Sequence, residues 1–90
     1  MLLKGKKALI TGCNKGIGKS TLELFSKNGA EVYACVRNIK IEFKNFCQDL
    51  SQKYKIDIHP ISFDLNNEEE IKKAANEINT KAGKVDILVN

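Results

Sequence analysis

Three glycines near the start of the chain form the pattern best suited to binding a ligand. Gly12, Gly16 and Gly18 directly follow the apolar run at residues 8–10. A strand that ends in a glycine-rich turn and opens into a helix presents backbone N–H groups and a helix N-terminus, and both bind phosphate. A plain left-handed turn could use the same glycines. The second apolar run, about 20 residues further on, favours a dinucleotide-binding turn.

The same turn partly matches a P-loop, the ATP-binding pattern Gly-x-x-x-x-Gly-Lys-[Ser/Thr]. Gly18, Lys19 and Ser20 fit the end of that pattern. Its first glycine would fall at position 13, which is Cys13, and no clean apolar strand ends in a magnesium-binding aspartate. A degenerate P-loop NTPase is therefore a remote alternative.

Two cations point to the kind of dinucleotide. In dinucleotide folds an acid at the end of the second strand binds the ribose hydroxyls of NAD, whereas a nearby arginine accepts the 2′-phosphate of NADP. The second apolar run ends in Arg37 with no acid beside it, and Lys15 lies within the glycine turn. Either cation alone could be a solvated surface charge. The pair, without a repelling carboxylate, favours NADP(H) as the cofactor.

Apolar periodicity predicts four strands that alternate with three helices. This order is typical of an α/β protein, a Rossmann-type doubly wound parallel sheet with strand order 3-2-1-4. Pro60 lies in the third strand and cannot donate a ladder hydrogen bond, so that strand should lie at an edge. The strands are expected at residues 6–11, 31–36, 56–63 and 85–90, and the helices at residues 17–28, 43–54 and 67–82.

Finer features of the helices can also be predicted. Ile17, Leu24 and Phe25 have helical spacing and are expected to face the core in the first helix. Asn66, with Glu69 three residues later, predicts a capping box at the start of the third helix. Gly29 and Gly83 predict the ends of the first and third helices.

Composition excludes several classes of protein. The 90 residues carry a net charge of +4 without a run of five or six like charges, so nucleic acid is a poor candidate partner. No apolar stretch is long enough for a membrane span, and the N-terminal one is too short for a signal peptide. Three cysteines without CxxC spacing predict no zinc site and suggest a cytoplasmic, reducing compartment. They are expected to be packing residues, although Cys13 in the turn could be accessible to alkylation.

Four motifs together resemble the short-chain dehydrogenase/reductase family over the whole chain. They are Thr11-Gly12-x-x-x-Gly16-Ile17-Gly18, Arg37 after the second strand, Asp64-Leu65 after the third, and Asp86-Ile87-Leu88-Val89-Asn90. Within that family, the motifs most resemble those of 3-oxoacyl-[acyl-carrier-protein] reductases. The resemblance implies hydride transfer from NADPH to a carbonyl, such as a 3-oxoacyl thioester, in a homo-oligomer.

The resemblance also implies roles for individual residues. Asp64 would contact the adenine amino group, with the backbone of Leu65 beside it, and Asn14 would lie near the adenosine ribose. The N–H of Ile17 would bind the pyrophosphate. Asn90 would be the first residue of the family's Asn-Asn-Ala-Gly motif. The predicted cofactor-binding residues are Gly12, Asn14, Lys15, Gly16, Ile17, Gly18, Arg37, Asp64, Leu65 and Asn90.

The family's catalytic pattern, a serine with Tyr-x-x-x-Lys, has no counterpart in these 90 residues. Tyr33 is followed four positions later by Arg37, and Tyr54 by Ile58. We therefore expect residues 1–90 to be the N-terminal, dinucleotide-binding part of one domain, truncated at the fourth strand. By itself this part should be inactive, and unstable or associated. A non-catalytic dinucleotide-binding fragment is the alternative. His59 is expected to be exposed or packed, not catalytic.

Overall fold

A computed structural model describes all 90 residues, and it has the predicted alternation of strands and helices. Parallel pairing gives a four-stranded sheet in the order β3-β2-β1-β4, which confirms the predicted topology. The elements are β1 (Lys7–Ile10), α1 (Gly16–Lys27), β2 (Glu31–Val36), α2 (Ile41–Tyr54), β3 (Ile58–Ser62), α3 (Glu68–Ala82) and β4 (Ile87–Val89).

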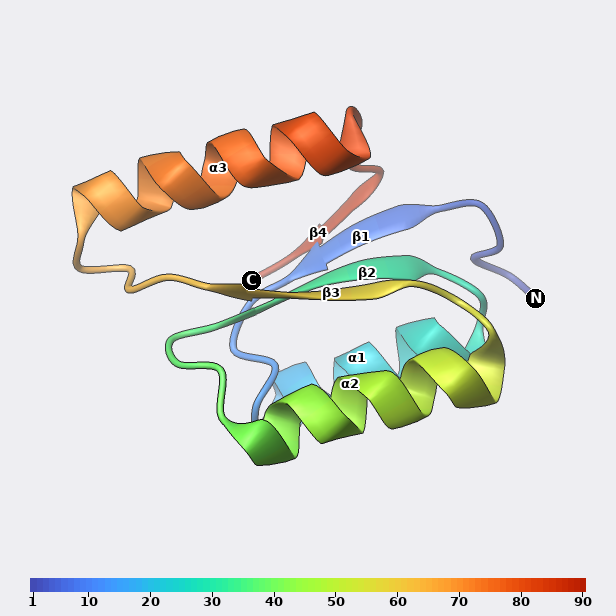
Figure 1. Cartoon of the computed structure of the whole chain (residues 1–90). Coiled ribbons are helices and arrows are strands. Elements are labelled where there is room, and N and C mark those ends of the chain that lie inside the picture. Colours follow the sequence, from blue (N-terminus) through green and yellow to red (C-terminus); the bar gives the residue numbers. More distant parts are fainter.

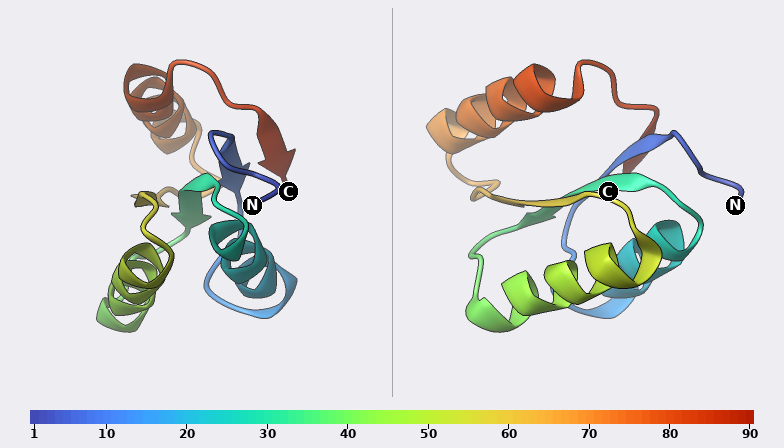
Figure 2. Two further views of the ribbon diagram at one scale, coloured as in Figure 1. Left: turned by 90° about the vertical axis from the view of Figure 1, so that its right-hand side faces the viewer. Right: turned by 45° about the vertical axis from the view of Figure 1, so that its right-hand side comes forward.

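The helices form two layers around the sheet. Helices α1 and α2 lie together on one face, and α3 alone covers the other (Figures 1 and 2). This division follows from the strand order, because the first two crossovers run in one direction and the third reverses. The order of the strands reverses between β1 and β4, and folds of this kind bind ligands in the crevice at that point. None of the three helices combines the length and apolar character that crossing a membrane requires.

Strand β2 is the centre of the core. Its residues from Val32 to Val36 are all buried, and they alternate between the two faces of the sheet. Val32, Ala34 and Val36 pack with the α1 and α2 layer, whereas Tyr33 and Cys35 pack with α3. A strand covered on both faces needs a continuous apolar run, which is what the sequence 32–36 provides.

The edge position of β3 is confirmed. Pro60 pairs in register with Ala34 of β2, and β3 has no strand on its other side. A proline on an edge strand leaves no ladder hydrogen bond unmade, provided that its nitrogen faces outward.

The buried face of α1 differs from the predicted one. Ile17 is 85% exposed and Leu24 is 57% exposed, while Leu22 and Ser26 are fully buried. Phe25 is half-buried and does pack against the core. Leu22 and Ser26 follow Gly18 at intervals of four and so lie on the same side of the helix, and Gly18 itself is in close contact with the turn. Buried Ser26 is satisfied by donating to the Leu22 carbonyl at 2.7 Å.

The N-cap of α3 is Asn67, one residue later than predicted. Its side chain accepts a hydrogen bond from the Glu70 N–H at 3.2 Å. The Glu70 carboxylate reaches back to the Asp64 N–H, also at 3.2 Å, and so ties the loop after β3 to the helix. The predicted ends of α1 at Gly29 and of α3 at Gly83 are confirmed by positive φ angles of 91° and 70°.

The corrected cap gives a stability prediction. Replacing Asn67 with alanine should lower the free energy of unfolding by about 1 kcal/mol, because the first turn of α3 loses a side-chain acceptor. Replacing Asn66 with alanine is the matched control and should change it by less than about 0.5 kcal/mol. Urea denaturation of both variants measures the difference, and an equal loss from both would contradict the assignment of the cap.

Candidate functional site

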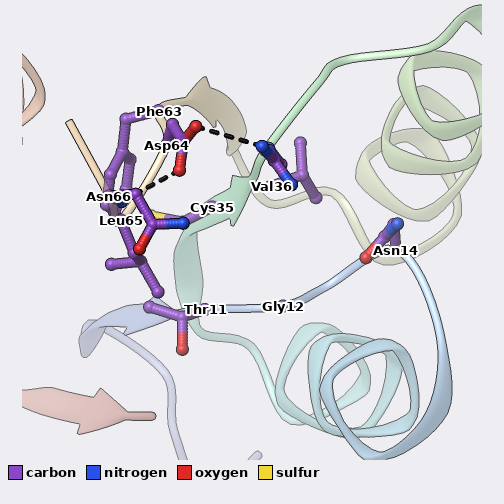
Figure 3. A pocket seen from close by; sticks show the side chains of 10 residues that line it. Thr11, Gly12, Asn14, Cys35, Val36, Phe63, Asp64, Leu65 and Asn66 are labelled. Carbon is purple, nitrogen blue, oxygen red and sulfur yellow. Dashed lines mark hydrogen bonds and ion pairs between the residues drawn. The ribbon is translucent and has the colours of Figure 1, made fainter. Parts of the chain in front are cut away.

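A pocket of about 290 Å³ opens at the carboxyl ends of β1, β2 and β3. Figure 3 shows the segment from Phe63 to Asn66 on one side of it, Thr11 and Gly12 along the base, and Asn14 across from them. Carboxyl ends of parallel strands meet at one edge of the sheet, so three loops far apart in sequence come together there. The lining residues are Thr11, Gly12, Asn14, Cys35, Val36, Arg37, Phe63, Asp64, Leu65 and Asn66.

Half of the predicted site residues line this pocket, namely Gly12, Asn14, Arg37, Asp64 and Leu65. Sequence reasoning did not include the other five lining residues in the site. Cys35, Val36 and Phe63 are apolar and belong to the strand ends, where the sequence marks them only as core. They lie within two residues of Arg37 or Asp64 in the sequence, and this proximity could have indicated that they line the same site.

The glycine turn needs glycine for two different reasons. Gly12 and Gly16 have φ angles of 61° and 58°, in the left-handed region that side chains disfavour. Gly18 has no such angle, but a Cβ there would lie 2.0 Å from the carbonyl oxygen of Gly12. Glycine at this position therefore permits close packing of the helix on the turn. The helix backbone rests directly on the turn.

The N-terminus of α1 is free to bind an anion. Its N-cap residue, Lys15, makes no side-chain cap, and the first turn contains no acidic residue. The first turn of α3, in contrast, is capped by Asn67 and carries three glutamates. The first turn of α1, at Gly16 and Ile17, therefore presents unpaired N–H groups and the positive end of the helix dipole beside the pocket.

The geometry does not suit a P-loop. Lys19, which would have to reach a phosphate, instead places its ammonium over the ring of Phe46, 4.7 Å from the centroid. Cys13 occupies the position of the first P-loop glycine and is fully buried. The turn therefore lacks both the backbone freedom and the free lysine of that motif.

Arg37 and Asp64 form an ion pair across the mouth of the pocket. The guanidinium Nη2 lies 3.2 Å from Asp64 Oδ2, and the arginine side chain is 71% exposed. Such an exposed pair contributes at most about 1 kcal/mol to stability. The remaining carboxylate oxygen of Asp64 accepts from the Asn66 N–H at 2.9 Å. Two residues predicted to bind different parts of one cofactor are thus already in contact.

Asn90 lies outside the pocket but is tied to the glycine turn. Thr11 donates from its hydroxyl to Asn90 Oδ1 at 3.0 Å, and its N–H donates to the Val89 carbonyl, also at 3.0 Å. β4 is therefore joined to the start of the turn. Lys15, Gly16, Ile17 and Gly18 likewise stand beside the pocket, at the N-terminus of α1, and do not line it.

The expectation that Cys13 is accessible is wrong. Its side chain is fully buried and its thiol donates to the Ile10 carbonyl at 3.1 Å. Burial, with a smaller contribution from the nearby Cys35, raises the pKa of Cys13 to about 12. The turn folds inward at Cys13 because the Cys13 N–H bonds to the Cys35 carbonyl at 3.2 Å.

Thiol labelling tests this burial. At pH 8 the native protein should leave Cys13, Cys35 and Cys47 unlabelled by a thiol reagent, since all three are buried. Burial raises the pKa of Cys35 and Cys47 to about 11. Unfolding in urea should label all three, because an exposed thiol has a pKa near about 8.5. Peptide mapping identifies the sites, and rapid labelling of native Cys13 would contradict the structure.

Neither tyrosine can serve as a catalytic acid in this site. Tyr33 is fully buried on the α3 side of the sheet, and burial together with its hydrogen bond to Glu31 raises its pKa to about 12. Tyr54 packs against the core at the far end of α2. Among the residues that line the pocket, only Asp64 and Cys35 are ionisable acids.

Known proteins share this arrangement. The family described as short chain dehydrogenase matches residues 6–90. The mitochondrial borneol dehydrogenase of Lavandula x intermedia is 37% identical over 89 residues, which cover 98% of this chain and 31% of that enzyme. The 3-oxoacyl-[acyl-carrier-protein] reductase FabG of Aquifex aeolicus is 33% identical over 88 residues, covering 98% of this chain and 35% of that enzyme.

A solved structure has a similar fold. L-sorbose reductase from Gluconobacter frateurii, complexed with NADPH and L-sorbose, superposes with a TM-score of 0.88 at 28% identity. The match covers 98% of this chain and 33% of that chain. The 90 residues thus span about a third of the length of the relatives they match.

Proposed function

The chain belongs to the short-chain dehydrogenase family of oxidoreductases, and we propose that residues 1–90 bind the adenosine half of NADP(H). The observation that carries this proposal is the pocket at the carboxyl edge of the sheet, with the open N-terminus of α1 beside it. We further propose that these residues are the N-terminal portion of one dinucleotide-binding domain. The relatives' greater length supports that placement.

The size of the pocket favours part of a cofactor. Sites for drug-sized ligands enclose about 300–1,000 Å³, so 290 Å³ suits an adenosine moiety and not a whole dinucleotide. Phe63 and Leu65 provide apolar contact for a base, and the carboxylate of Asp64 can accept from the adenine amino group. Asn14, on the opposite side, is placed to contact the ribose (Figure 3).

The phosphates would lie at the glycine turn. Gly12 and Gly16 keep the backbone free of side chains there, and a Cβ at either position would meet nothing within 4 Å. The N–H of Ile17, in the first turn of α1, can donate to the pyrophosphate. The absence of an acid in that turn removes the repulsion that a carboxylate would add.

Arg37 supports NADP(H) over NAD(H). It follows β2 directly, its side chain is largely exposed, and its one partner is a surface carboxylate. A 2′-phosphate carries more charge than that carboxylate and can compete for the guanidinium, as Lys15 can from the glycine turn. Charge-assisted hydrogen bonds contribute roughly 1.5–3 kcal/mol each, or about tenfold or more in affinity.

For the complete protein we propose NADPH-dependent reduction of a carbonyl to an alcohol, by a homo-oligomer. The relatives include an L-sorbose reductase and a 3-oxoacyl-[acyl-carrier-protein] reductase, and both names fit carbonyl reduction. A 3-oxoacyl thioester is one candidate substrate. The reaction's catalytic groups would have to come from outside residues 1–90, because neither Tyr33 nor Tyr54 has a lysine four positions later.

Cofactor titration tests the proposal. NADPH and NADH are titrated separately into the full-length protein by calorimetry, and NADPH should bind at least about tenfold more tightly. NADH binding that is equal or tighter would refute the assignment of NADP(H). Steady-state reduction of a ketone and thioester panel follows. Tight NADPH binding without turnover would support the alternative, a non-catalytic dinucleotide-binding protein.

A further inference from the structure

A polar cluster lies at the amino-terminal ends of β2 and β3, at the opposite ends of these strands from the pocket. It contains Glu31, Asp57 and His59, whose potential ligand atoms all lie within 4.8 Å of one another. Glu31 opens β2, and Asp57 continues the β3 ladder because its carbonyl accepts from the Val32 N–H at 3.1 Å. Backbone pairing therefore holds the three side chains together.

The imidazole of His59 is held in one orientation. Its Nε2 lies 2.9 Å from Glu31 Oε2, and its ring stacks on that of Tyr33 with centroids 4.6 Å apart. Tyr33 is its register partner in β2 and donates from its hydroxyl to the same Glu31 oxygen at 3.1 Å. Tyr33 thus orients the Glu31 carboxylate through its hydroxyl and the His59 imidazole through its ring, as residues behind the ligands do in metal sites.

The cluster has two carboxylates that no lysine or arginine neutralises. The chain has a net charge of +4. Of its three ion pairs, the one that involves this cluster joins Glu31 to His59, and none joins Glu31 or Asp57 to a lysine or arginine. Lys7 pairs with Glu31 in the sheet register, but its ammonium instead donates to the Ala82 carbonyl at 2.7 Å. Lys6 lies in the hollow beside Glu31 and Asp57 but forms no ion pair with either carboxylate. Two carboxylates without a direct lysine or arginine partner favour a bound cation.

We propose that Glu31, Asp57 and His59 bind one divalent transition-metal ion, with zinc the best match. An imidazole nitrogen and two carboxylate oxygens form a ligand set that zinc accepts, and three protein ligands leave a position for water. The ion would replace the proton on His59 Nε2, and that proton would pass to solvent. Sequence spacing predicted no metal site, because Glu31 meets Asp57 and His59 only through the pairing of β2 with β3.

The distances allow such an ion. In a tetrahedral site, ligand atoms at about 2.0–2.2 Å from zinc lie about 3.3–3.6 Å from each other. The ligand atoms of the cluster, which lie within 4.8 Å of one another, would therefore have to draw together, and the exposed side chain of Asp57 is free to move. Glu31 and Asp57, together with Lys6, also line a surface hollow of about 220 Å³ through which an ion could enter.

Zinc titration of the chelator-treated full-length protein tests this site. Calorimetry should show saturable binding of one Zn²⁺ that depends on the cluster. Substitutions H59Q and D57N should each weaken it at least about tenfold, since loss of even an outer-shell partner costs 10–100-fold. The control D49N removes an equal charge from α2, on the other face of the sheet, and should bind zinc like the unmodified protein.

The fold of each variant is checked by circular dichroism without zinc. If H59Q fails to fold, D57N still decides the question, because Asp57 is exposed and its side chain has no ion-pair partner. Absence of saturable zinc binding overturns the proposal. So does binding that D57N and a folded H59Q leave unchanged, since the ion would then lie elsewhere. NADPH affinity is independent of either outcome.

Discussion

Replacing Gly18 with alanine should lower both stability and NADPH affinity. The added Cβ would lie 2.0 Å from the carbonyl oxygen of Gly12 and 2.6 Å from its carbon, and both atoms are backbone. No side chain can move aside to relieve the contact, so α1 must shift away from the turn. Overpacking of this kind costs about 1–3 kcal/mol. The shift also moves the N–H groups that would bind phosphate, so affinity should fall at least about tenfold.

Thermal unfolding and NADPH titration of G18A measure the two effects separately. The matched control is G83A at the end of α3, where φ is 70° and an added Cβ would meet nothing within 4 Å. A non-glycine residue in that region costs roughly 1–2 kcal/mol, so G83A should be less stable but bind NADPH normally. A G18A variant with the original melting temperature and affinity would contradict the close contact between helix and turn.

Replacing Arg37 with alanine should weaken NADPH binding by about tenfold or more and leave NADH binding nearly unchanged. The reason is that only NADPH has a 2′-phosphate for the guanidinium to bind. The fold should tolerate the change, because the ion pair with Asp64 is exposed. The control K27A removes one positive charge from the last turn of α1 and should alter neither affinity.

Asp64 provides a second arm of the same experiment. The substitution D64N removes the charge that pairs with Arg37. It also weakens the acceptor that we propose for the adenine amino group, which NADPH and NADH share. Affinity for both cofactors should therefore fall. Calorimetry with R37A, D64N and the double variant forms a cycle that measures the coupling between the two residues. Equal losses of NADPH and NADH affinity in R37A would refute its role in cofactor selection.

The sheet and its order could be predicted because they depend on patterns within short segments. The apolar run of β2, the heptad-like spacing of Phe43, Cys47 and Leu50 in α2, and the proline of β3 each follow from neighbouring residues. The crossover rule then limits the order of parallel strands. The glycine turn was likewise visible in the sequence, since its spacing reflects a local backbone requirement.

The side-chain contacts of the site could not be predicted in the same way. Arg37 and Asp64 are 27 residues apart, and Glu31 and His59 are 28 apart, so only the pairing of β2 with β3 brings each pair together. The inward position of Cys13 depends on a hydrogen bond to Cys35 in another strand.

Sequence by itself therefore determined the family and the order of elements, and it predicted the place where a phosphate would bind. Tertiary structure alone decided which side of α1 is buried, the side on which Gly18 contacts the turn. It also decided that Arg37, which we propose selects the cofactor, pairs with Asp64, and that two carboxylates and the only histidine meet at the far edge of the sheet. The physical reason is that local propensity acts over a few residues, whereas strand register joins residues that are distant along the chain.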